Sequence, residues 1–247
     1  MNTFRPCILI PVYNHGSTLA TLIAQLSVYQ LPIVLVDDGS DAATQAHIAA
    51  VVANNQSITA LRLSANGGKG AAVMHGLQTA WGMGCSHALQ IDADGQHDCA
   101  DVPQFLTLGA ANPEAVICGQ PVFDASVPKG RLYGRYITHF WVWIETLSFA
   151  IGDSMCGYRL YPLSSTCELI QSVSIPRRMD FDTAIAVRLA WRGAAFVNVP
   201  TRVTYPVGGL SHFKMWADNW RITKMHTLLV IGMLLRLPIL LARKLNR

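Results

Sequence analysis

Four short runs that are wholly or mostly apolar, each followed at once by polar residues, constrain the fold of this chain more than any other feature. The runs occupy residues 7–12, 33–36, 58–63 and 87–91, and helix-like segments separate them. Strands that are apolar along their whole length are buried on both faces, which is typical of a parallel sheet covered by helices. The chain is therefore predicted to have an α/β fold, with a mostly parallel sheet flanked by helices.

The polar residues after these runs predict where a ligand binds. Right-handed crossovers place the carboxyl ends of parallel strands at one edge of the sheet, and open α/β sheets bind their ligands there. We expect three polar segments to meet at this edge: Tyr13-Asn14-His15, Asp37-Asp38-Gly39-Ser40 and Asp92-Ala93-Asp94.

The pair Asp92 and Asp94 favours a cation site. Carboxylates two residues apart beyond a strand end can converge on a hard cation, and Mg²⁺ or Mn²⁺ held in this way keeps positions open for substrate phosphates. Aspartate is also common in turns, so the pair gains weight only from its neighbours along the same edge.

The second half of the chain is less regular. Residues 129–149 are predicted to form a long, aromatic-rich helix, with Arg131 and Arg135 on one face because they are four residues apart. Residues 181–192 favour a further helix and residues 194–205 an extended segment. We expect residues 214–247 to be helical, with a break or kink at Pro238.

Composition narrows the class of protein. Hydrophobic residues make up 51% of the chain and charged residues 14%, which is apolar for a soluble protein without reaching the level of a multi-span membrane protein. The six cysteines are scattered and form no Cys-x-x-Cys pair. This pattern indicates reduced thiols in a cytosolic protein rather than a disulfide framework or a zinc site.

Positive charge gathers near the carboxyl end of the sequence. Between residues 202 and 247 there are eight Lys or Arg and one acidic residue, which predicts an anionic partner such as a membrane surface or phosphates. Nucleic acid is not expected, because the basic residues alternate with Leu, Ile and Met. The apolar stretch 227–235 is interrupted at Arg236, which favours a helix lying on a membrane over one that spans it. A helix packed into the core is the alternative.

Six motifs in a fixed order carry a family resemblance. They are Pro11-Val12-Tyr13-Asn14, Val36-Asp37-Asp38-Gly39-Ser40-Asp41, Asn66-Gly67-Gly68-Lys69-Gly70, Asp92-Ala93-Asp94-Gly95-Gln96-His97, Gly157-Tyr158-Arg159 and Phe181-Asp182. With them the chain resembles a family 2 glycosyltransferase of the GT-A fold, most of all the branch of dolichyl- and undecaprenyl-phosphate sugar synthases. The resemblance covers roughly residues 6–215.

The resemblance implies a donor and a metal. A UDP- or GDP-sugar would be held by Pro11, Tyr13, Asn14, Asp37, Asp38, Lys69 and Asp92. Mg²⁺ or Mn²⁺ would be bound by Asp92, Asp94 and Gln96 and would stabilise the departing diphosphate. Lys69 is expected near the phosphates or the acidic edge, although a purely structural glycine turn is the alternative for its segment.

The resemblance also implies an acceptor site. Asp182, acting with Asp94, would be the catalytic residue and would take a proton from an acceptor hydroxyl. With a lipid phosphate as acceptor no base is needed, and Asp182 would orient a group or contact the metal. Asp180 is the rival position, and Ala184 stands where related sequences usually carry Glu, so the acidic cluster is thinner than usual.

Arginines and histidines complete the expected site. Arg131, Arg135 and Arg159 are candidates for binding the acceptor phosphate or the donor diphosphate, because the guanidinium pairs well with phosphate. His97 is expected to be an exposed loop residue, and His212 a weak candidate for a diphosphate contact.

The expectation is a metal-dependent, inverting glycosyltransferase with a lipid or lipid-phosphate acceptor. It would be cytoplasmic and peripherally bound to the inner face of the plasma membrane. Residues 1–213 would form the catalytic domain, with a nucleotide half of about 1–120 and an acceptor half of about 121–213, and residues 214–247 a membrane-associating tail. The alternatives are a saccharide-chain glycosyltransferase of cell-envelope polysaccharide synthesis and a degenerate GT-A domain that serves as a binding or scaffold protein.

Overall fold

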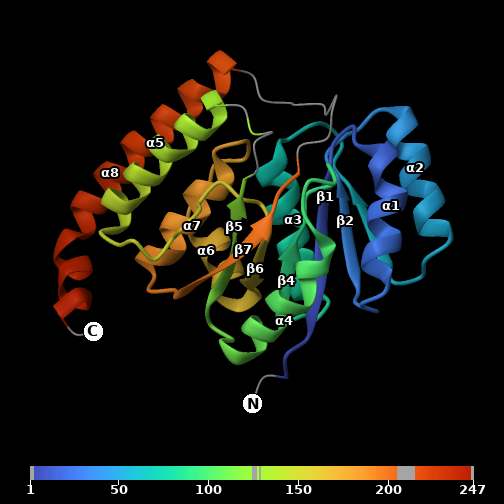
Figure 1. The fold of residues 1–247 in the computed structure, drawn as a ribbon, viewed down its shortest axis with the longest axis horizontal. Coiled ribbons are helices and arrows are strands. Elements are labelled where there is room, and N and C mark those ends of the chain that lie inside the picture. Colours follow the sequence, from blue (N-terminus) through green and yellow to red (C-terminus); the bar gives the residue numbers. More distant parts are fainter. Residues whose placement is uncertain (1–2, 124–126, 128, 205–214, 246–247) are drawn as a thin grey trace.

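A seven-stranded sheet with helices on both faces forms the body of the protein (Figure 1). The computed structural model describes residues 3–123, 127, 129–204 and 215–245. Within these residues the strand order is β3-β2-β1-β4-β6-β5-β7. The strands are β1 (Pro6–Val12), β2 (Ile33–Asp37), β3 (Ile58–Arg62), β4 (His87–Gln90), β5 (Val116–Val122), β6 (Arg159–Pro162) and β7 (Phe196–Arg202).

Helices connect most of the strands and cover the sheet. They are α1 (Gly16–Ser27), α2 (Ala42–Ala53), α3 (Lys69–Gly82), α4 (Val102–Ala111), α5 (Lys129–Thr146), α6 (Leu163–Ser172), α7 (Phe181–Trp191) and α8 (Met215–Leu245), with a short 3₁₀ turn at Cys99–Asp101. The predicted α/β fold is confirmed. Elements α4, α6 and β5 were not predicted, and the proposed border near residue 120 falls within β5.

One strand runs against the others. β1, β2, β3 and β4 pair in parallel, as do β5 and β7, whereas β6 is antiparallel to both β4 and β5. The first residue of β6, Arg159, therefore pairs with the last residue of β4, Gln90. The reversed strand thus delivers the segment before Arg159 to the edge at which β1, β2 and β4 end.

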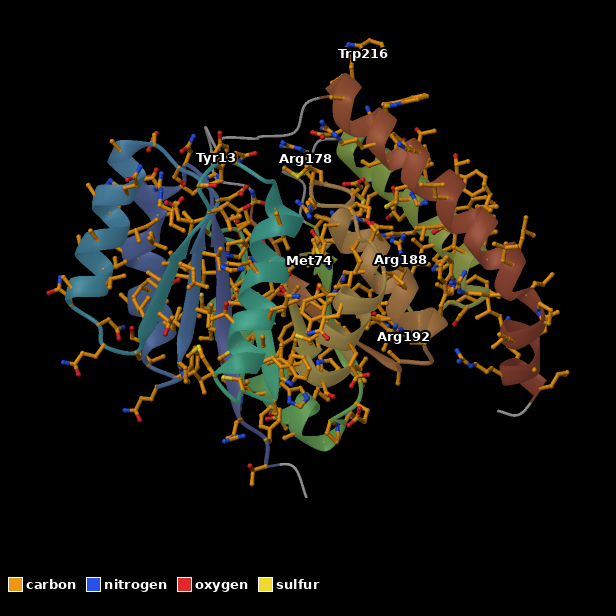
Figure 2. The ribbon with its side chains drawn as sticks, turned by 180° about the vertical axis from the view of Figure 1, so that it is seen from behind. Tyr13, Met74, Arg178, Arg188, Arg192 and Trp216 are labelled. Carbon is orange, nitrogen blue, oxygen red and sulfur yellow. The ribbon has the colours of Figure 1, made fainter. Side chains whose placement is uncertain are left out.

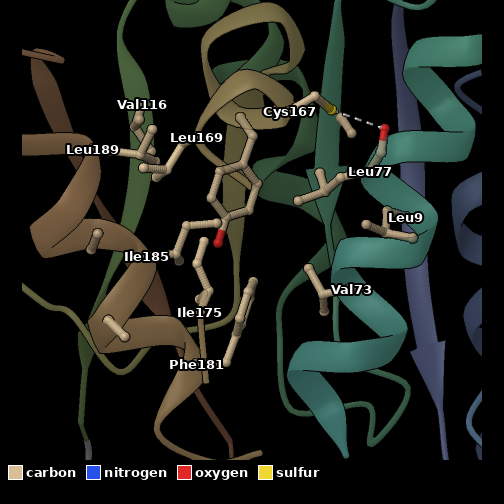
Figure 3. Packing of buried hydrophobic residues seen from close by; sticks show 14 of the residues in the cluster. Leu9, Val73, Leu77, Val116, Cys167, Leu169, Ile175, Phe181, Ile185 and Leu189 are labelled. Carbon is tan, nitrogen blue, oxygen red and sulfur yellow. Dashed lines mark hydrogen bonds between the residues drawn. The ribbon is translucent and has the colours of Figure 1, made fainter. Parts of the chain in front are cut away.

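Apolar side chains fill both faces of the sheet. On one face α3 packs between β1 and the pair α6 and α7, where Val73 and Leu77 lie near Leu9, as Figure 3 shows. The Cys167 thiol donates to the carbonyl of Leu77 at 3.6 Å in the same layer. Ile8 and Ile10 face the other layer, beneath α1 and α4. Because successive strand residues point to opposite faces, continuous apolar runs suit a sheet that is covered twice.

Helices α5 and α8 lie side by side at one end of the molecule (Figure 1). His226 Nδ1 lies 2.7 Å from Oε1 of the fully buried Glu145, and this pair joins the two helices. Pro238 lies inside α8, which continues to Leu245 without the predicted break. By length and composition alone, α8 is long and apolar enough to cross a membrane.

Candidate active site

The ammonium group of Lys69 lies between two carboxylates at the predicted edge of the sheet. Its Nζ is 2.8 Å from Oδ2 of Asp92 and 2.9 Å from Oδ2 of Asp182. Lys69 opens α3, Asp92 follows β4, and Asp182 lies in the first turn of α7. Three segments that are far apart in the sequence thus meet at one cation. The structure therefore joins a residue of the predicted acceptor site to two of the predicted donor site.

The pKa values in this cluster follow from the pairing. Burial alone would lower the pKa of Lys69, but Asp182 and Asp92 outweigh this penalty and hold it well above its ordinary value. Burial alone would likewise raise the pKa of Asp92, yet Lys69 and His97 hold it far below its usual range. Lys69 is therefore charged and Asp92 ionised at neutral pH.

A small cavity of about 90 Å³ opens beside this cluster. Four predicted residues line it: Asp92, Asp94, Gln96 and Arg135. Burial and the charge of Asp92 raise the pKa of Asp94, so this carboxylate would gain from a nearby cation. No group of three or more His, Cys, Asp or Glu suited to a metal occurs in the described part of the chain. Two carboxylates and an amide remain a suitable oxygen donor set for an ion that also binds phosphates.

Asp38 holds the turn that leads into Lys69. Its carboxylate accepts hydrogen bonds from the backbone N–H groups of Gly67 at 2.8 Å and Gly68 at 2.9 Å, and from Nδ2 of Asn66 at 3.0 Å. The side chain is buried, and this burial raises the pKa of Asp38 in spite of the N–H donors. Asp38 thus fixes the backbone from which Lys69 reaches Asp92.

The first two polar segments are tied to each other. The Asn14 amide oxygen accepts from the N–H of Asp41 at 2.9 Å, and the Asn14 N–H donates to the Ser40 hydroxyl at 3.1 Å. Asp37 accepts from the N–H of Ser40 at 2.8 Å and pairs with Arg62. Hydrogen bonds thus join the loop after β1 to the loop after β2.

Two other residues predicted to bind the nucleotide-sugar lie at the same end of the sheet. Tyr13 and Pro11 are partly buried at the end of β1. Figure 2 shows Tyr13 at the same end of the sheet as Arg178.

Arg159 departs from its predicted role. It is fully buried, and its guanidinium donates to the carbonyls of Asp182 at 2.9 Å, Ser154 at 3.2 Å and Cys156 at 3.3 Å, and to the Tyr161 hydroxyl at 3.3 Å. A guanidinium used in this way inside the protein does not bind an acceptor phosphate. Arg159 instead supports the backbone beneath Asp182.

Of the two other predicted arginines, Arg135 lies at the site, whereas the side chain of Arg131 is not described. Arg135 lines the cavity, and its guanidinium pairs with the buried carboxylate of Asp153, with Nη2 at 2.9 Å from Oδ1. The side chain of Arg131 lies outside the described part of the chain, as do Ser211 and His212.

The sequence prediction was wrong about one residue at this edge, His97, and did not include another, Arg178. His97 is not an exposed loop residue, since its side chain is 8% exposed, with Nε2 3.9 Å from Oδ2 of Asp92. Arg178 donates to Oδ1 of Asn66 at 3.1 Å and helps to keep the carboxylate of Asp38 ionised. The adjacency of His97 to the acidic motif was a usable signal, whereas nothing in the sequence around Arg178 pointed to it.

A larger hollow of about 420 Å³ lies at the opposite edge, near the residues that precede β5 and β7. Its lining contains none of the predicted site residues. Size alone therefore does not mark the functional site of this protein.

Comparison with known proteins agrees with this architecture. The family model described as Glycosyl transferase family 2 matches residues 7–173. The chain is 25% identical to a dolichyl-phosphate beta-glucosyltransferase of Dictyostelium discoideum, over 72% of this chain and 60% of the relative. It is 26% identical to a polyprenol monophosphomannose synthase of Mycolicibacterium smegmatis, over 89% of this chain and 84% of the relative.

A solved structure extends the comparison to the fold. The glucosyl-3-phosphoglycerate synthase of Mycobacterium tuberculosis, in complex with Mn²⁺, UDP-glucose and phosphoglyceric acid, superposes with a TM-score of 0.62 at 14% identity. The match covers 93% of this chain and 78% of that one, so the GT-A fold predicted from the motifs is confirmed. The chain belongs to glycosyl transferase family 2 and has the GT-A fold.

Proposed function

We propose that this protein is a metal-dependent, inverting glycosyltransferase that moves a sugar from a UDP- or GDP-sugar to a membrane-bound lipid acceptor, such as a polyprenyl phosphate. The observation that carries the proposal is the cavity in which Asp92, Asp94 and Gln96 meet Arg135. It combines oxygen ligands for a cation with the guanidinium of Arg135, which pairs with Asp153 and lines the cavity, where it could also attract a phosphate. The names of the two relatives support the acceptor class, since each includes a lipid alcohol joined to phosphate.

Asp92, Asp94 and Gln96 are the residues that would hold Mg²⁺ or Mn²⁺. When bound, the cation would stabilise the negative charge on the leaving diphosphate. The Mn²⁺ in the solved relative supports a divalent ion without selecting one. Lys69 keeps Asp92 ionised, and therefore able to act as a ligand, over the whole neutral range.

Asp182 is the residue proposed to meet the acceptor. Its Oδ2 contacts Lys69, while its buried Oδ1 has no hydrogen-bond partner among the described residues. An unpaired carboxylate oxygen at a buried site is costly unless a ligand satisfies it. This oxygen would accept the proton of an acceptor hydroxyl, or orient the acceptor when the nucleophile is already an anionic phosphate. Inversion is carried over from the family resemblance alone.

The paired helices α5 and α8 support a membrane surface as partner. Large apolar side chains on both helices are exposed, among them Tyr133, Tyr136, Ile137, Phe140, Leu228, Ile231, Leu234 and Leu235. We name these eight residues the apolar helix face. Trp216, 90% exposed, projects from the outer end of α8 (Figure 2). Arg243 and Lys244 in the last turn suit anionic headgroups.

The apolar helix face and the cavity share one helix. Arg135 of α5 lines the cavity, and its neighbour Tyr136 belongs to the exposed face. A lipid phosphate at a membrane surface would therefore be close to the proposed metal ligands. This geometry supports a peripheral position at a membrane surface, and we propose the inner face of the plasma membrane on the sequence expectation alone.

A transfer assay tests the proposed function. The purified protein is incubated with Mn²⁺, undecaprenyl phosphate in detergent and a panel of labelled UDP- and GDP-sugars, and the label is partitioned between organic and aqueous phases. We expect organic-soluble label with one donor, and its loss with a chelator or with Asp94→Asn. The matched control is Asp98→Asn, because the Asp98 side chain is exposed, accepts from the N–H of Ala100 at 2.9 Å and does not line the cavity.

The other outcomes identify the alternatives. Label transferred to an added saccharide, but never to lipid, would identify a saccharide-chain enzyme. Absence of both transfer and donor hydrolysis with every donor would favour a binding protein. Equal activity of wild type and Asp94→Asn would disprove the metal site.

A further inference from the structure

Gly157 lies against the pair formed by Lys69 and Asp92, and it is not among the site residues predicted from the sequence. The antiparallel register pairs Gln90 with Arg159. Two further residues along each segment bring Asp92 and Gly157 to the same place. The reversed direction of β6 is thus the reason that this glycine reaches the active edge.

The pair occupies the space that a side chain at position 157 would need. A Cβ on Gly157 would lie 2.5 Å from Oδ2 and 2.8 Å from Oδ1 of Asp92, and 2.6 Å from Nζ of Lys69. Real Cβ atoms essentially never approach other atoms closer than 3.0 Å. A side chain here would therefore force the ends of the Asp92 and Lys69 side chains to move, so glycine serves close approach at this position and not an unusual backbone angle.

The backbone around Gly157 is fixed from both sides. The carbonyl of Tyr158 accepts from the N–H of Gly119 at 2.8 Å, and the carbonyl of Cys156 accepts from the buried Arg159 at 3.3 Å. The Tyr158 ring stacks on Phe105 with centroids 4.3 Å apart. An added methyl group would therefore displace the ends of the Lys69 and Asp92 side chains before it moved the strand.

We infer that Gly157 is a positioning residue: its missing side chain sets the place of the Lys69 ammonium between Asp92 and Asp182. Lys69 is the contact that joins the proposed metal ligand to the proposed acceptor carboxylate. The distance between these two groups therefore depends on the space at Gly157. The catalytic meaning of this distance rests on the proposed function, whereas the packing of Gly157 against Lys69 does not.

The first test compares Gly157→Ala with Gly82→Ala, because a Cβ at Gly82 meets no atom within 4 Å. We expect both variants to fold, and Gly157→Ala to reduce kcat of transfer by about 100-fold with a smaller change in KM, because misplacement of reacting groups by about 1 Å has this scale. Gly82→Ala should keep wild-type activity. A Gly157→Ala protein with wild-type kcat would overturn the inference.

A double-mutant cycle asks whether Gly157 acts through Lys69. Gly157→Ala added to Lys69→Ala should change kcat and the affinity for Mn²⁺ with UDP, measured by calorimetry, by less than about threefold, because contacting residues are not additive. An undiminished effect in the Lys69→Ala background would contradict the inference.

Thermal unfolding separates this inference from the proposed function. If no donor is turned over, the melting temperatures of the same four proteins still report the coupling between the two positions. If Gly157→Ala fails to fold, Lys69→Ala should restore folding, because it removes the clash with Nζ and releases Asp92, the other clashing side chain, from its ion pair. Failure of that rescue would show that Lys69 is not what Gly157 accommodates.

Discussion

The guanidinium of Arg159 donates a 2.9 Å hydrogen bond to the main-chain carbonyl of Asp182 from inside the protein. The carboxylate of the same aspartate contacts Lys69 on the side of the site. Asp182 is thus held by Arg159 through its backbone carbonyl and by Lys69 through its carboxylate. The motif Gly157-Tyr158-Arg159 therefore positions the active edge at two points, since Gly157 lies beside Lys69.

Arg159→Met should destabilise the protein strongly. The substitution removes the guanidinium that donates to the buried carbonyls of Asp182, Ser154 and Cys156, although the Ser154 carbonyl keeps the Thr183 hydroxyl, 3.4 Å away, as a second donor. Each unsatisfied buried group costs about 1–3 kcal/mol, so we expect the free energy of unfolding to fall by about 3–5 kcal/mol. Urea denaturation followed by circular dichroism measures this change. The control is Arg192→Met, because Arg192 is exposed and its guanidinium donates to the Ser172 hydroxyl. We expect this variant to lose less than about 1 kcal/mol, and equal losses in the two variants would contradict a structural role for the buried Arg159.

Asp38→Ala should lower stability even without nucleotide. The carboxylate accepts three hydrogen bonds from residues 66–68, so its removal leaves the buried N–H of Gly68 and two partly buried N–H groups unpaired, at a cost of about 2 kcal/mol. Thermal unfolding of the ligand-free variant measures this effect. A residue that only contacts the nucleotide would leave the ligand-free melting temperature unchanged, and that result would show that these three hydrogen bonds add nothing to stability.

The sequence was sufficient for those parts of the site that follow from strand order. Short, mostly apolar runs located β1, β2, β3 and β4, and the polar residues after β1, β2 and β4 met at one edge as expected. Lys69, Asp92 and Asp182 came from motifs, and the structure brings their side chains into contact. The apolar runs and the family motifs predicted the same site because the motifs lie directly after the strands, at the same edge of the sheet.

The parts that were missed depend on non-local pairing. Nothing near residues 159–162 indicates that β6 runs antiparallel to β4, so neither the approach of Gly157 to Asp92 nor the burial of Arg159 was foreseeable. Arginine is seldom fully buried, and a motif arginine therefore favours a ligand role until its carbonyl partners are seen. His97 was misjudged in the same way, because its burial depends on the Tyr158 ring, 5.0 Å away between centroids.

His87 should make stability depend on pH. Its ring is buried between the Ser86 hydroxyl and the Pro113 carbonyl, each at 2.9 Å, and burial lowers the pKa of His87 below its ordinary value of 6.5. As the pH falls through 6.5 the unfolded chain takes up the proton first, so this contribution is complete above 6.5 and is lost as the pH falls through the folded pKa.

The stability of His87→Gln should therefore vary less with pH than that of the wild type. The free energy of unfolding is measured from about pH 7.5 to about pH 5.5, a range that brackets the histidine pKa. His75→Gln is the control, because His75 is exposed on α3. Parallel curves for the wild type and His87→Gln would rule out a contribution from this histidine.

Membrane binding should depend on α5 as well as on α8. Ile137 and Phe140 are 61% and 56% exposed on α5, and each would bury apolar area in a lipid surface. Burying one such side chain is worth about 1.5 kcal/mol or more, so Ile137→Ser combined with Phe140→Ser should weaken binding to anionic vesicles by tenfold or more, taking about 1.4 kcal/mol per factor of ten. Co-sedimentation over a series of lipid concentrations measures this change.

The matched control removes exposed apolar side chains from elsewhere on the molecule. Val28 and Met83 are 70% and 46% exposed and follow α1 and α3, so Val28→Ser combined with Met83→Ser should bind vesicles like the wild type. Donor hydrolysis without vesicles should be similar in both double variants, because none of these side chains lines the cavity. If the α5 variant bound vesicles as tightly as the wild type while removal of residues 227–247 abolished binding, the tail alone would be the anchor and the apolar helix face on α5 would have another use.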